Sequence, residues 1–227
     1  MRDDIDPHHD YAQALSGPVP DYLLEVERQT FLKTMAPQML SGQLQGRILS
    51  LLSKLRQPQT ILEVGTFTGY AALCMAEGLA PGGKLHTIEG NQETAFLARQ
   101  NFAASPFADQ IELHIGQALE LLQELPSVFD LVFLDGDKRG YPEYFHQLID
   151  RLSPGGILLA DNILWDGKVS ASGKPDLDVE ALRAYNQLLV DDPRVEVVVL
   201  PLRDGLSVAR KKISLQIENG TEIKDIK

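Results

Sequence analysis

The sequence predicts an α/β fold built around a mostly parallel sheet, and three observations support this prediction. From residue 60 onward, short apolar segments alternate with segments of helical spacing, which is the pattern of repeated βαβ units. Two apolar segments, 129–134 and 156–161, stop abruptly at acidic residues, as buried parallel strands do at the ligand-binding edge of a sheet. The length of 227 residues suits one domain with a full core, or at most two small ones.

The expected elements follow one another along the chain. Residues 21–35 and 43–56 show helical spacing of apolar residues. Residues 195–201 and 206–210 flank an Arg-Asp-Gly turn, so they predict a β-hairpin in which one strand runs antiparallel to the rest of the sheet. The other strands are expected at 60–64, 84–89, 111–115, 129–134 and 156–161, and the helices between them at 69–79, 91–104, 117–124 and 141–152.

The two ends of the chain differ from this central pattern. Residues 1–20 are polar and contain several prolines, so we expect a loose N-terminal arm that could pack on a partner subunit. A single domain would then span 21–212. Residues 213–227 are polar and lack a clear pattern, and a disordered tail is the default interpretation.

Composition limits the classes of function. The formal net charge of −11 argues against a broad nucleic-acid surface, which needs clustered lysine and arginine. The single cysteine, Cys74, excludes an internal disulfide and indicates a reducing compartment. The sequence has neither an N-terminal leader pattern nor an apolar run long enough to cross a membrane. We therefore expect a soluble, cytoplasmic protein.

Polar residues follow two of the predicted strands at the point where each strand ends. Asp135 and Asp137 come after strand 129–134, and Asp161 and Asn162 close strand 156–161. Because the carboxyl ends of parallel strands meet at one edge, these side chains should lie close together. Oxygen ligands suit Mg²⁺, Ca²⁺ or Mn²⁺ better than zinc. Lys138 supplies a candidate base, and Asp137 is interpreted as a helix-start residue rather than a ligand.

A glycine turn follows the first predicted strand. Its G-x-x-x-G spacing, which starts at Gly65, is not the G-x-G-x-x-G that seats a pyrophosphate. Glu63, at the end of the strand, would repel a phosphate, which favours a nucleoside with an uncharged linker. Glu89 ends the second strand, where an acid hydrogen-bonds ribose hydroxyls. The small residues Gly116 and Ala118 after the third strand leave room for a flat base.

Two segments are specific enough to indicate a family. Residues 133–138 read Phe-Leu-Asp-Gly-Asp-Lys and residues 161–167 read Asp-Asn-Ile-Leu-Trp-Asp-Gly. With segments 39–46, 63–70, 87–89, 192–194 and 200–210, they resemble the cation-dependent, S-adenosylmethionine-using O-methyltransferases. These are the caffeoyl-CoA O-methyltransferases and, more distantly, catechol O-methyltransferase. The resemblance covers residues 21–211. It implies a Rossmann-like class I methyltransferase fold, with a seven-stranded, mostly parallel sheet, one antiparallel strand in a C-terminal β-hairpin, and helices on both faces.

The resemblance also implies roles for individual residues. Asp135, Asp161 and Asn162 would be the metal ligands, and Lys138 would lie where the family has its general base. Substrate contacts would come from Asp166 and from Trp165, which we interpret as an aromatic wall. The residues that would line the cofactor are Ser41, Glu63, Gly65, Thr66, Ala71, Glu89, Ala118 and Asp135.

These assignments predict a metal-dependent enzyme that moves the methyl group of S-adenosylmethionine to a hydroxyl of a catechol-like diol. A phenol has a pKa of about 10, so it is a poor nucleophile at neutral pH, and a bound cation would favour its deprotonated form. Mg²⁺ prefers six oxygens, which the three protein ligands, a vicinal diol and one water would supply. The substrate would be a small phenolic molecule. Because family members form dimers, we also expect a homodimer.

Three alternatives stay open. A tRNA hydroxyuridine O-methyltransferase would need a basic surface, for which Arg139, Lys168 and Lys174 are the candidates. A nicotinamide-dependent oxidoreductase is disfavoured by the missing dinucleotide motif. A nucleoside-binding protein without catalysis would have no need of the metal ligands. Elsewhere in the predicted strands, His86 and His114 are interpreted as packed or edge residues rather than catalytic ones.

Overall fold

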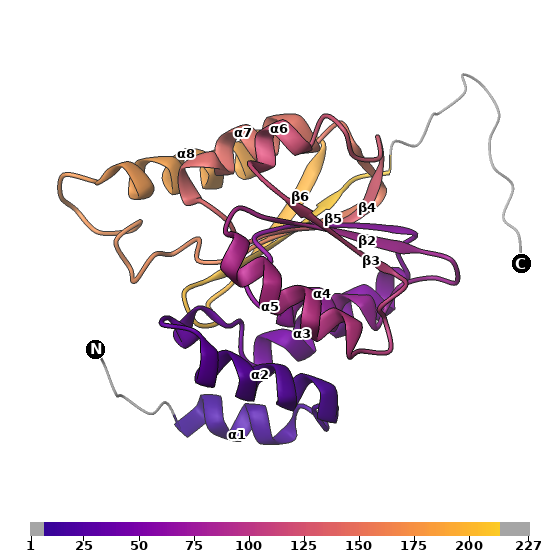
Figure 1. The fold of residues 1–227 in the computed structure, drawn as a ribbon. Helices are drawn as coiled ribbons and strands as arrows, with labels where there is room; N and C mark the ends of the chain where they lie inside the picture. The colour runs from indigo at the N-terminus through magenta and orange to yellow at the C-terminus, as the bar shows by residue number, and fades with distance from the viewer. Residues whose placement is uncertain (1–6, 214–227) are drawn as a thin grey trace, which may run out of the picture.

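A seven-stranded sheet lies between two layers of helices in the computed structural model, which describes residues 7–213 (Figure 1). The strand order is β3-β2-β1-β4-β5-β7-β6. Only β7 runs antiparallel to its neighbours, as the hairpin predicted. The strands are β1 (Thr60–Val64), β2 (Lys84–Glu89), β3 (Ile111–Ile115), β4 (Phe129–Leu134), β5 (Leu152–Ala160), β6 (Val195–Leu200) and β7 (Leu206–Lys211).

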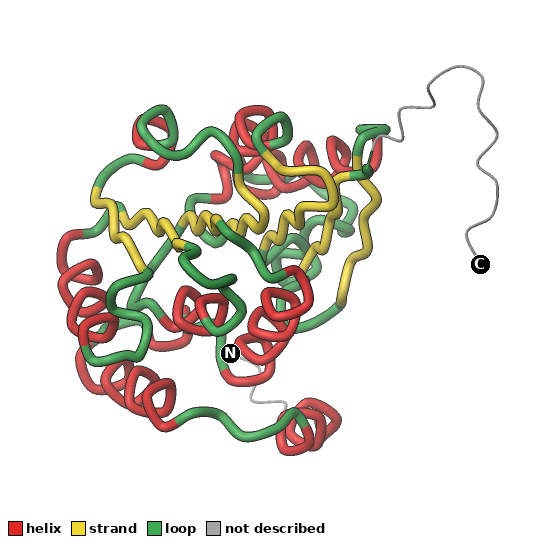
Figure 2. Tube along the Cα trace, turned by 90° about the vertical axis from the view of Figure 1, so that its right-hand side faces the viewer, coloured by secondary structure: helices red, strands yellow, loops and turns green. Residues whose placement is uncertain are grey.

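Helices cover both faces of the sheet, as predicted (Figures 1 and 2). One layer holds α6 (Ala118–Leu121), α7 (Tyr141–Leu148) and α8 (Leu177–Asp191). The other holds α3 (Gln43–Arg56), α4 (Tyr70–Ala76) and α5 (Gln92–Ala103), with α2 (Asp21–Lys33) and α1 (Pro7–Leu15) outside them. None of the helices in residues 7–213 is long and apolar enough to cross a membrane.

The central strands are continuous apolar runs because both of their faces are buried. Alternate residues of β1 and β4 point to opposite layers, since side chains in a strand have a period of two. Leu62, Val132 and Leu134 enter the core under α7 and α8, whereas Ile61, Leu131 and Phe133 enter the core over α3 and α4. This burial fixes the register of β1 and β4 and therefore the position at which each strand ends.

The structure departs from the sequence prediction at three places. Residues Pro7–Leu15 of the expected loose arm form helix α1. Strand β5 begins at Leu152, before the predicted start at residue 156. Its pairing with β4 shifts register between Phe129 and Leu131, and this irregularity accommodates Pro154 and Gly155 within the strand. Several helices are shorter than predicted. The predicted tail, 213–227, lies outside the described residues after Ile213, and the boundaries 1–20 and 21–212 stay predictions.

A buried carboxylate joins the helices on the α3–α4 side. Glu77, just after α4, accepts hydrogen bonds from Tyr22 on α2 and from Arg47, Ser50 and Lys54 on α3, at 2.6 to 3.0 Å. Its side chain is 9% exposed. Burial opposes the charged form, but the hydrogen bonds outweigh burial and hold the pKa of Glu77 at about 2.

We predict that Glu77→Gln lowers the free energy of unfolding at pH 7 by about 3 kcal/mol, because it leaves Arg47, whose side chain is only 13% exposed, without its counter-charge. The pKa of Glu77 is about 2 in the fold against an ordinary 4.5. Its contribution is therefore fully present above pH 4.5 and is lost as the pH falls towards 2. Urea unfolding at several pH values should show the two proteins converging below pH 4.5.

The matched control is Glu25→Gln, which removes an exposed carboxylate on α2 that pairs with Arg28. This variant should unfold at the same urea concentration as the wild type. Equal effects of the two substitutions would mean that the Glu77 cluster does not stabilise the helical layer.

Candidate active site

A cavity of about 940 Å³ opens where the parallel strands end, within the roughly 300–1,000 Å³ range of small-molecule sites. Its wall takes one residue from the carboxyl end of each of the five parallel βα strands in turn. These residues are Gly65, Glu89, Gly116, Asp135 and Asp161, and Ala118 at the start of α6 also lines the cavity. The two acidic strand ends predicted from the sequence therefore meet in one cavity, next to the predicted glycine turn.

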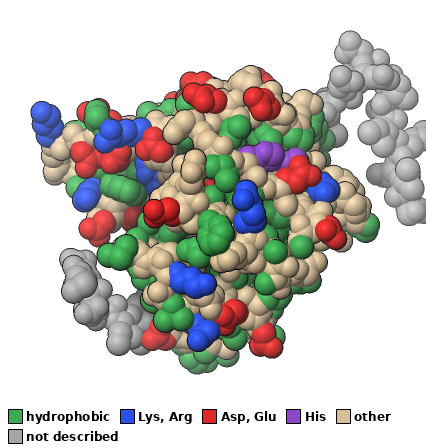
Figure 3. Space-filling model, in the orientation of Figure 1, with side chains coloured by type: hydrophobic (Ala, Val, Ile, Leu, Met, Phe, Trp, Pro, Cys, Tyr) green, Lys and Arg blue, Asp and Glu red, His purple; other side chains and the backbone are tan. Residues whose placement is uncertain are grey.

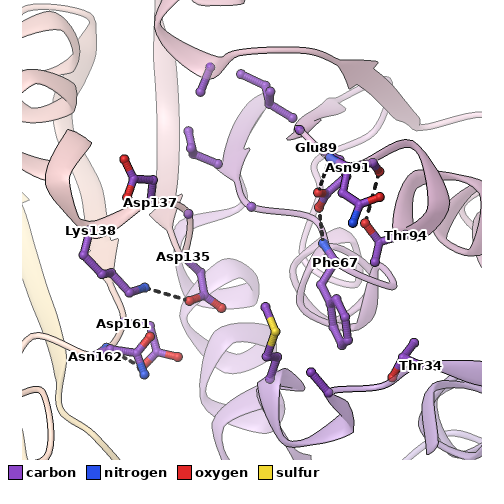
Figure 4. Close-up of a pocket in the computed structure, with 18 of the residues that line it drawn as sticks. Thr34, Phe67, Glu89, Asn91, Thr94, Asp135, Asp137, Lys138, Asp161 and Asn162 are labelled. Atoms are coloured by element: carbon purple, nitrogen blue, oxygen red, sulfur yellow. Dashed lines mark hydrogen bonds and ion pairs between the residues drawn. The ribbon is translucent and has the colours of Figure 1, made fainter. Parts of the chain in front are cut away.

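Lys138 and Asp135 form a partly buried ion pair in the cavity (Figure 4). The Nζ of Lys138 lies 3.1 Å from Asp135 Oδ1 and donates to the hydroxyl of Tyr141 at 2.8 Å. Lys138 itself is 8% exposed. The hydroxyl of Tyr141 donates in turn to the carbonyl of Leu134 at 2.9 Å. Tyr141 therefore helps to hold the ammonium group of Lys138 in place.

Asp161 and Asn162 lie beside this pair, at the end of β5 (Figure 4). Asp161 Oδ1 accepts from the backbone N–H of Asn162 at 2.8 Å, and Oδ2 accepts from the buried amide of Gln45 at 2.7 Å. Asn162 has φ +60°, a left-handed conformation that asparagine tolerates better than most residues. The turn presents the side chains of Asp161 and Asn162 together at the sheet edge.

The electrostatics of the site favour a bound cation. Burial raises the pKa of Asp135 to about 6, with Lys138 opposing the rise and the negative charge of Asp161 adding to it. Two carboxylates and an amide oxygen form a hard, oxygen-only donor set, which suits Mg²⁺, Ca²⁺ or Mn²⁺. The side chains of Asp135, Asp161 and Asn162 are therefore of the right kind to hold such an ion.

Glu89 organises the opposite side of the cavity (Figure 4). Its Oε2 accepts from the backbone N–H of Phe67 at 2.7 Å, and its Oε1 accepts from that of Asn91 at 2.8 Å. These bonds connect the turn after β1 to the end of β2. Gly65, in that turn, has φ +97° and lies so close to the backbone of Asp135 that a Cβ would overlap its carbonyl group.

The remaining predicted cofactor residues are buried and lie outside the cavity wall. They are Ser41, Glu63, Thr66 and Ala71. Glu63 is fully buried and accepts a hydrogen bond from Thr87. Burial raises the pKa of Glu63 well above its usual range. Direct contact of these four residues with a cofactor stays a prediction.

The predicted substrate residues are separated by the structure. Trp165 lines the cavity in a left-handed backbone conformation, φ +48°, which is an outlier for a bulky residue. Asp166 is exposed, lies outside the cavity wall and donates its backbone N–H to Asp204. The carboxylate of Asp137 points away from Asp135 (Figure 4), in keeping with the interpretation that it is not a ligand.

Three residues that support the site were missed by the sequence reasoning. Tyr141 is the first residue of the predicted helix 141–152 and has no predicted role in the site, although its position three residues after Lys138 signals a contact. Gln45 lies in the helix α3 and reaches Asp161 from more than a hundred positions away in sequence, so no local pattern reveals it. Arg203, in the hairpin turn, lines the cavity and donates to the carbonyls of Leu40 and Ser41.

The sheet order and the cavity at its carboxyl edge are those of class I S-adenosylmethionine-dependent methyltransferases. The structure is similar to an O-methyltransferase, TomG from Streptomyces achromogenes, solved with S-adenosylmethionine, with a TM-score of 0.84 and 31% identity over 89% of this chain and 95% of that one. It is also similar to an O-methyltransferase from Bacillus cereus, solved with S-adenosylhomocysteine. This comparison gives a TM-score of 0.83 and 29% identity, and it covers 89% of this chain and 96% of that one.

Sequence comparison gives the same result. The O-methyltransferase family model matches residues 13–212. A catechol O-methyltransferase of Niastella koreensis is 33% identical over 73% of this chain and 79% of its own length. Caffeoyl-CoA O-methyltransferase 1 of Eucalyptus globulus is 33% identical over 74% of this chain and 72% of its own length. The chain belongs to this family of S-adenosylmethionine-dependent O-methyltransferases.

We predict that Gly65→Ala destabilises the fold and weakens S-adenosylmethionine binding, because the new methyl group would push the turn away from Asp135. Its matched control is Gly82→Ala. Gly82 also has a positive φ, +77°, but has nothing within 4 Å of a Cβ. The control should cost about 1 kcal/mol of backbone strain, and Gly65→Ala about 1–3 kcal/mol more.

Thermal unfolding and calorimetric titration with S-adenosylmethionine check both proteins. Gly82→Ala should bind the cofactor as the wild type does. If Gly65→Ala bound the cofactor equally well, the turn after β1 would not be part of the cofactor site.

Proposed function

We propose that the protein is a divalent-cation-dependent O-methyltransferase that methylates one hydroxyl of a catechol-like vicinal diol. The observation that carries this proposal is the meeting of Asp135, Asp161 and Asn162 with Lys138 in the wall of one cavity. The same cavity contains Glu89 and Ala118, at the strand ends where a nucleoside cofactor is expected. Donor groups for a cation and a binding site for a methyl donor are therefore neighbours.

The proposed chemistry begins with the acidity of the acceptor. A phenol has a pKa of about 10, so removal of its proton limits its reactivity at neutral pH. When bound, the cation supplies a Lewis acid that favours the deprotonated hydroxyl. Asp135 and Asp161 would hold it and balance its charge, while the neutral Asn162 would add an oxygen without further lowering the charge.

Lys138 is the residue that we propose to move the proton. Its Nζ lies at the cavity wall between Asp135 and Tyr141. In its neutral form, the amine would accept the proton of the acceptor hydroxyl at Nζ. Tyr141 would keep the amine in position, because its own hydroxyl hydrogen is committed to a backbone carbonyl. With the proton removed, the acceptor oxygen needs only alignment with the methyl group.

A flat aromatic acceptor fits the rest of the cavity. Trp165 lines the wall next to the end of β5, and an aromatic ring beside a planar substrate provides apolar contact area and fixes the orientation of the substrate. Two sequence relatives carry the names of catechol and caffeoyl-CoA enzymes, whose named substrates contain a vicinal diol. This supports a small phenolic acceptor.

The proposal predicts methyl transfer from S-adenosylmethionine to catechol in the presence of Mg²⁺, with loss of turnover in EDTA and recovery on adding excess Mg²⁺. A phenol with a single hydroxyl is the matched substrate control and should be a poor acceptor, because it lacks the second oxygen. Formation of S-adenosylhomocysteine reports both reactions. Unchanged turnover in EDTA would contradict the metal dependence.

A second prediction concerns the base. Lys138→Met should lower kcat by about 10²- to 10⁴-fold, the usual contribution of general acid–base catalysis, while S-adenosylmethionine binding measured by calorimetry persists. The control is Arg139→Gln, which removes the next basic residue. Arg139 is exposed and paired with Asp178, so its loss should leave kcat with catechol unchanged. Equal kcat values for the two variants would remove Lys138 from the mechanism.

The tRNA alternative predicts a different pattern. Turnover of hydroxylated tRNA but not of catechol would mean that the acceptor is an RNA and not a small molecule, and Arg139→Gln would then weaken RNA binding.

Homodimer formation and a cytoplasmic location are also part of the proposal. Size-exclusion chromatography with light scattering measures the first of these.

A further inference from the structure

A second group of potential metal ligands lies away from the cavity, on strands β2 and β3. His86, Glu112 and His114 each offer one ligand atom, and these three atoms all lie within 4.8 Å of one another. None of the three lines the cavity. Figure 3 shows histidine side chains gathered at one place on the surface, with acidic and basic side chains next to them. We call this group the histidine cluster.

The register of the two strands brings the histidine cluster together. His86 on β2 is the direct partner of Glu112 on β3, and partnered residues of neighbouring strands project from the same face. His114 follows Glu112 by two positions, so it also projects from that face. The ligands are thus presented by hydrogen-bonded strands rather than by loops, which gives the precise positioning that metal sites need.

Two of the three distances between the ligand atoms are close to those of a tetrahedral metal site. His86 Nδ1 lies 3.2 Å from His114 Nε2 and 3.4 Å from Glu112 Oε2. Tetrahedral zinc with bonds of about 2.0–2.1 Å separates its ligand atoms by about 3.3 Å. The two imidazole rings are stacked, with centroids 5.4 Å apart and planes at 28°. The third pair of ligand atoms, from Glu112 and His114, lies within 4.8 Å, so ion binding requires these two more exposed side chains to move closer together.

Without an ion, the same side chains interact through a hydrogen bond between the two histidines and ion pairs with Glu112. Glu112 Oε1 lies 3.4 Å from Lys84 Nζ, but the other oxygen, Oε2, is the one that faces His86. Lys84 also donates to the carbonyl of Asp109 at 2.8 Å. The lysine thus occupies one side of the carboxylate and leaves the oxygen that faces the histidines available to an ion.

We propose that His86, Glu112 and His114 bind a divalent transition-metal ion of the zinc class. Two imidazoles and one carboxylate suit zinc and its neighbours, whereas Mg²⁺ and Ca²⁺ prefer oxygen ligands alone. His86 is buried, His114 is partly exposed and Glu112 is exposed, so the ion enters from solvent and a fourth position stays open to water. This site is separate from the oxygen donors at the ends of β4 and β5.

The ion has a structural consequence for the cofactor side of the molecule. It joins β2 to β3, which is the edge strand of the sheet. A few residues beyond the histidine cluster, Glu89 at the end of β2 and Gly116 just after β3 line the cavity wall. Zinc binding therefore stabilises the edge of the sheet from which that wall is built, and should raise the unfolding temperature of the protein.

The test is a titration of the full-length, chelator-treated protein with Co²⁺ and then with competing Zn²⁺, in excess Mg²⁺ to occupy oxygen sites. Nitrogen ligands in a four-coordinate site give Co²⁺ an intense visible absorption. The wild type should take up one equivalent. His114→Ala and Glu112→Gln should each weaken Zn²⁺ binding by more than about tenfold, because loss of a direct ligand costs at least as much as loss of a residue that only hydrogen-bonds to a ligand. Zn²⁺ should no longer raise the unfolding temperature of either variant.

Two control variants test the rival locations for the ion. Asp161→Asn alters the oxygen site, and His9→Ala alters a surface histidine near the N-terminus. Both should bind Co²⁺ and Zn²⁺ as the wild type does. Wild-type affinity in both His114→Ala and Glu112→Gln, or loss of the signal in either control, would overturn the proposal. Because Glu112 is exposed, its variant provides the result if His114→Ala fails to fold.

Discussion

The structure depends on taking three charged side chains out of water at one edge of the sheet. Asp135, Lys138 and Asp161 are all buried or nearly so, and each buried charge costs several kcal/mol unless it is compensated. Lys138 compensates Asp135, and Gln45 donates to Asp161. The negative charge in the site still exceeds the positive charge. A divalent cation would balance the excess negative charge. The place where buried charge costs the fold most free energy is therefore also the place of the proposed chemistry.

The rest of the fold holds this cluster in place. Apolar side chains on both faces of β1 and β4 fix the register of the central strands, and register determines which residue follows each strand end. From the two helical layers, α3 delivers Gln45 and α7 delivers Tyr141. The antiparallel hairpin brings Arg203 to the cavity from the far end of the sequence. The packing of the strands, the two helical layers and the hairpin therefore all position side chains around the same acidic edge of the sheet.

Sequence reasoning predicted the strands and the acidic edge because both are local patterns. Asp135 and Asp161 end apolar runs, and parallel strands must end together. It could not predict Gln45, because a contact between α3 and β5 follows only from the complete packing. It also placed the start of β5 at residue 156 instead of Leu152, since the earlier start depends on a register shift against the neighbouring strand. The pairing of His86 with Glu112 likewise needs the register of β2 and β3.

The most direct test of the oxygen site is anomalous diffraction from crystals of the protein grown with S-adenosylhomocysteine and soaked in Mn²⁺, a close substitute for Mg²⁺. We expect a peak between the side chains of Asp135, Asp161 and Asn162, at a metal–oxygen distance of about 2.1 Å as for Mg²⁺. The peak should disappear in Asp161→Asn. A map without a peak at this edge, in crystals that contain the cofactor product, would contradict the account.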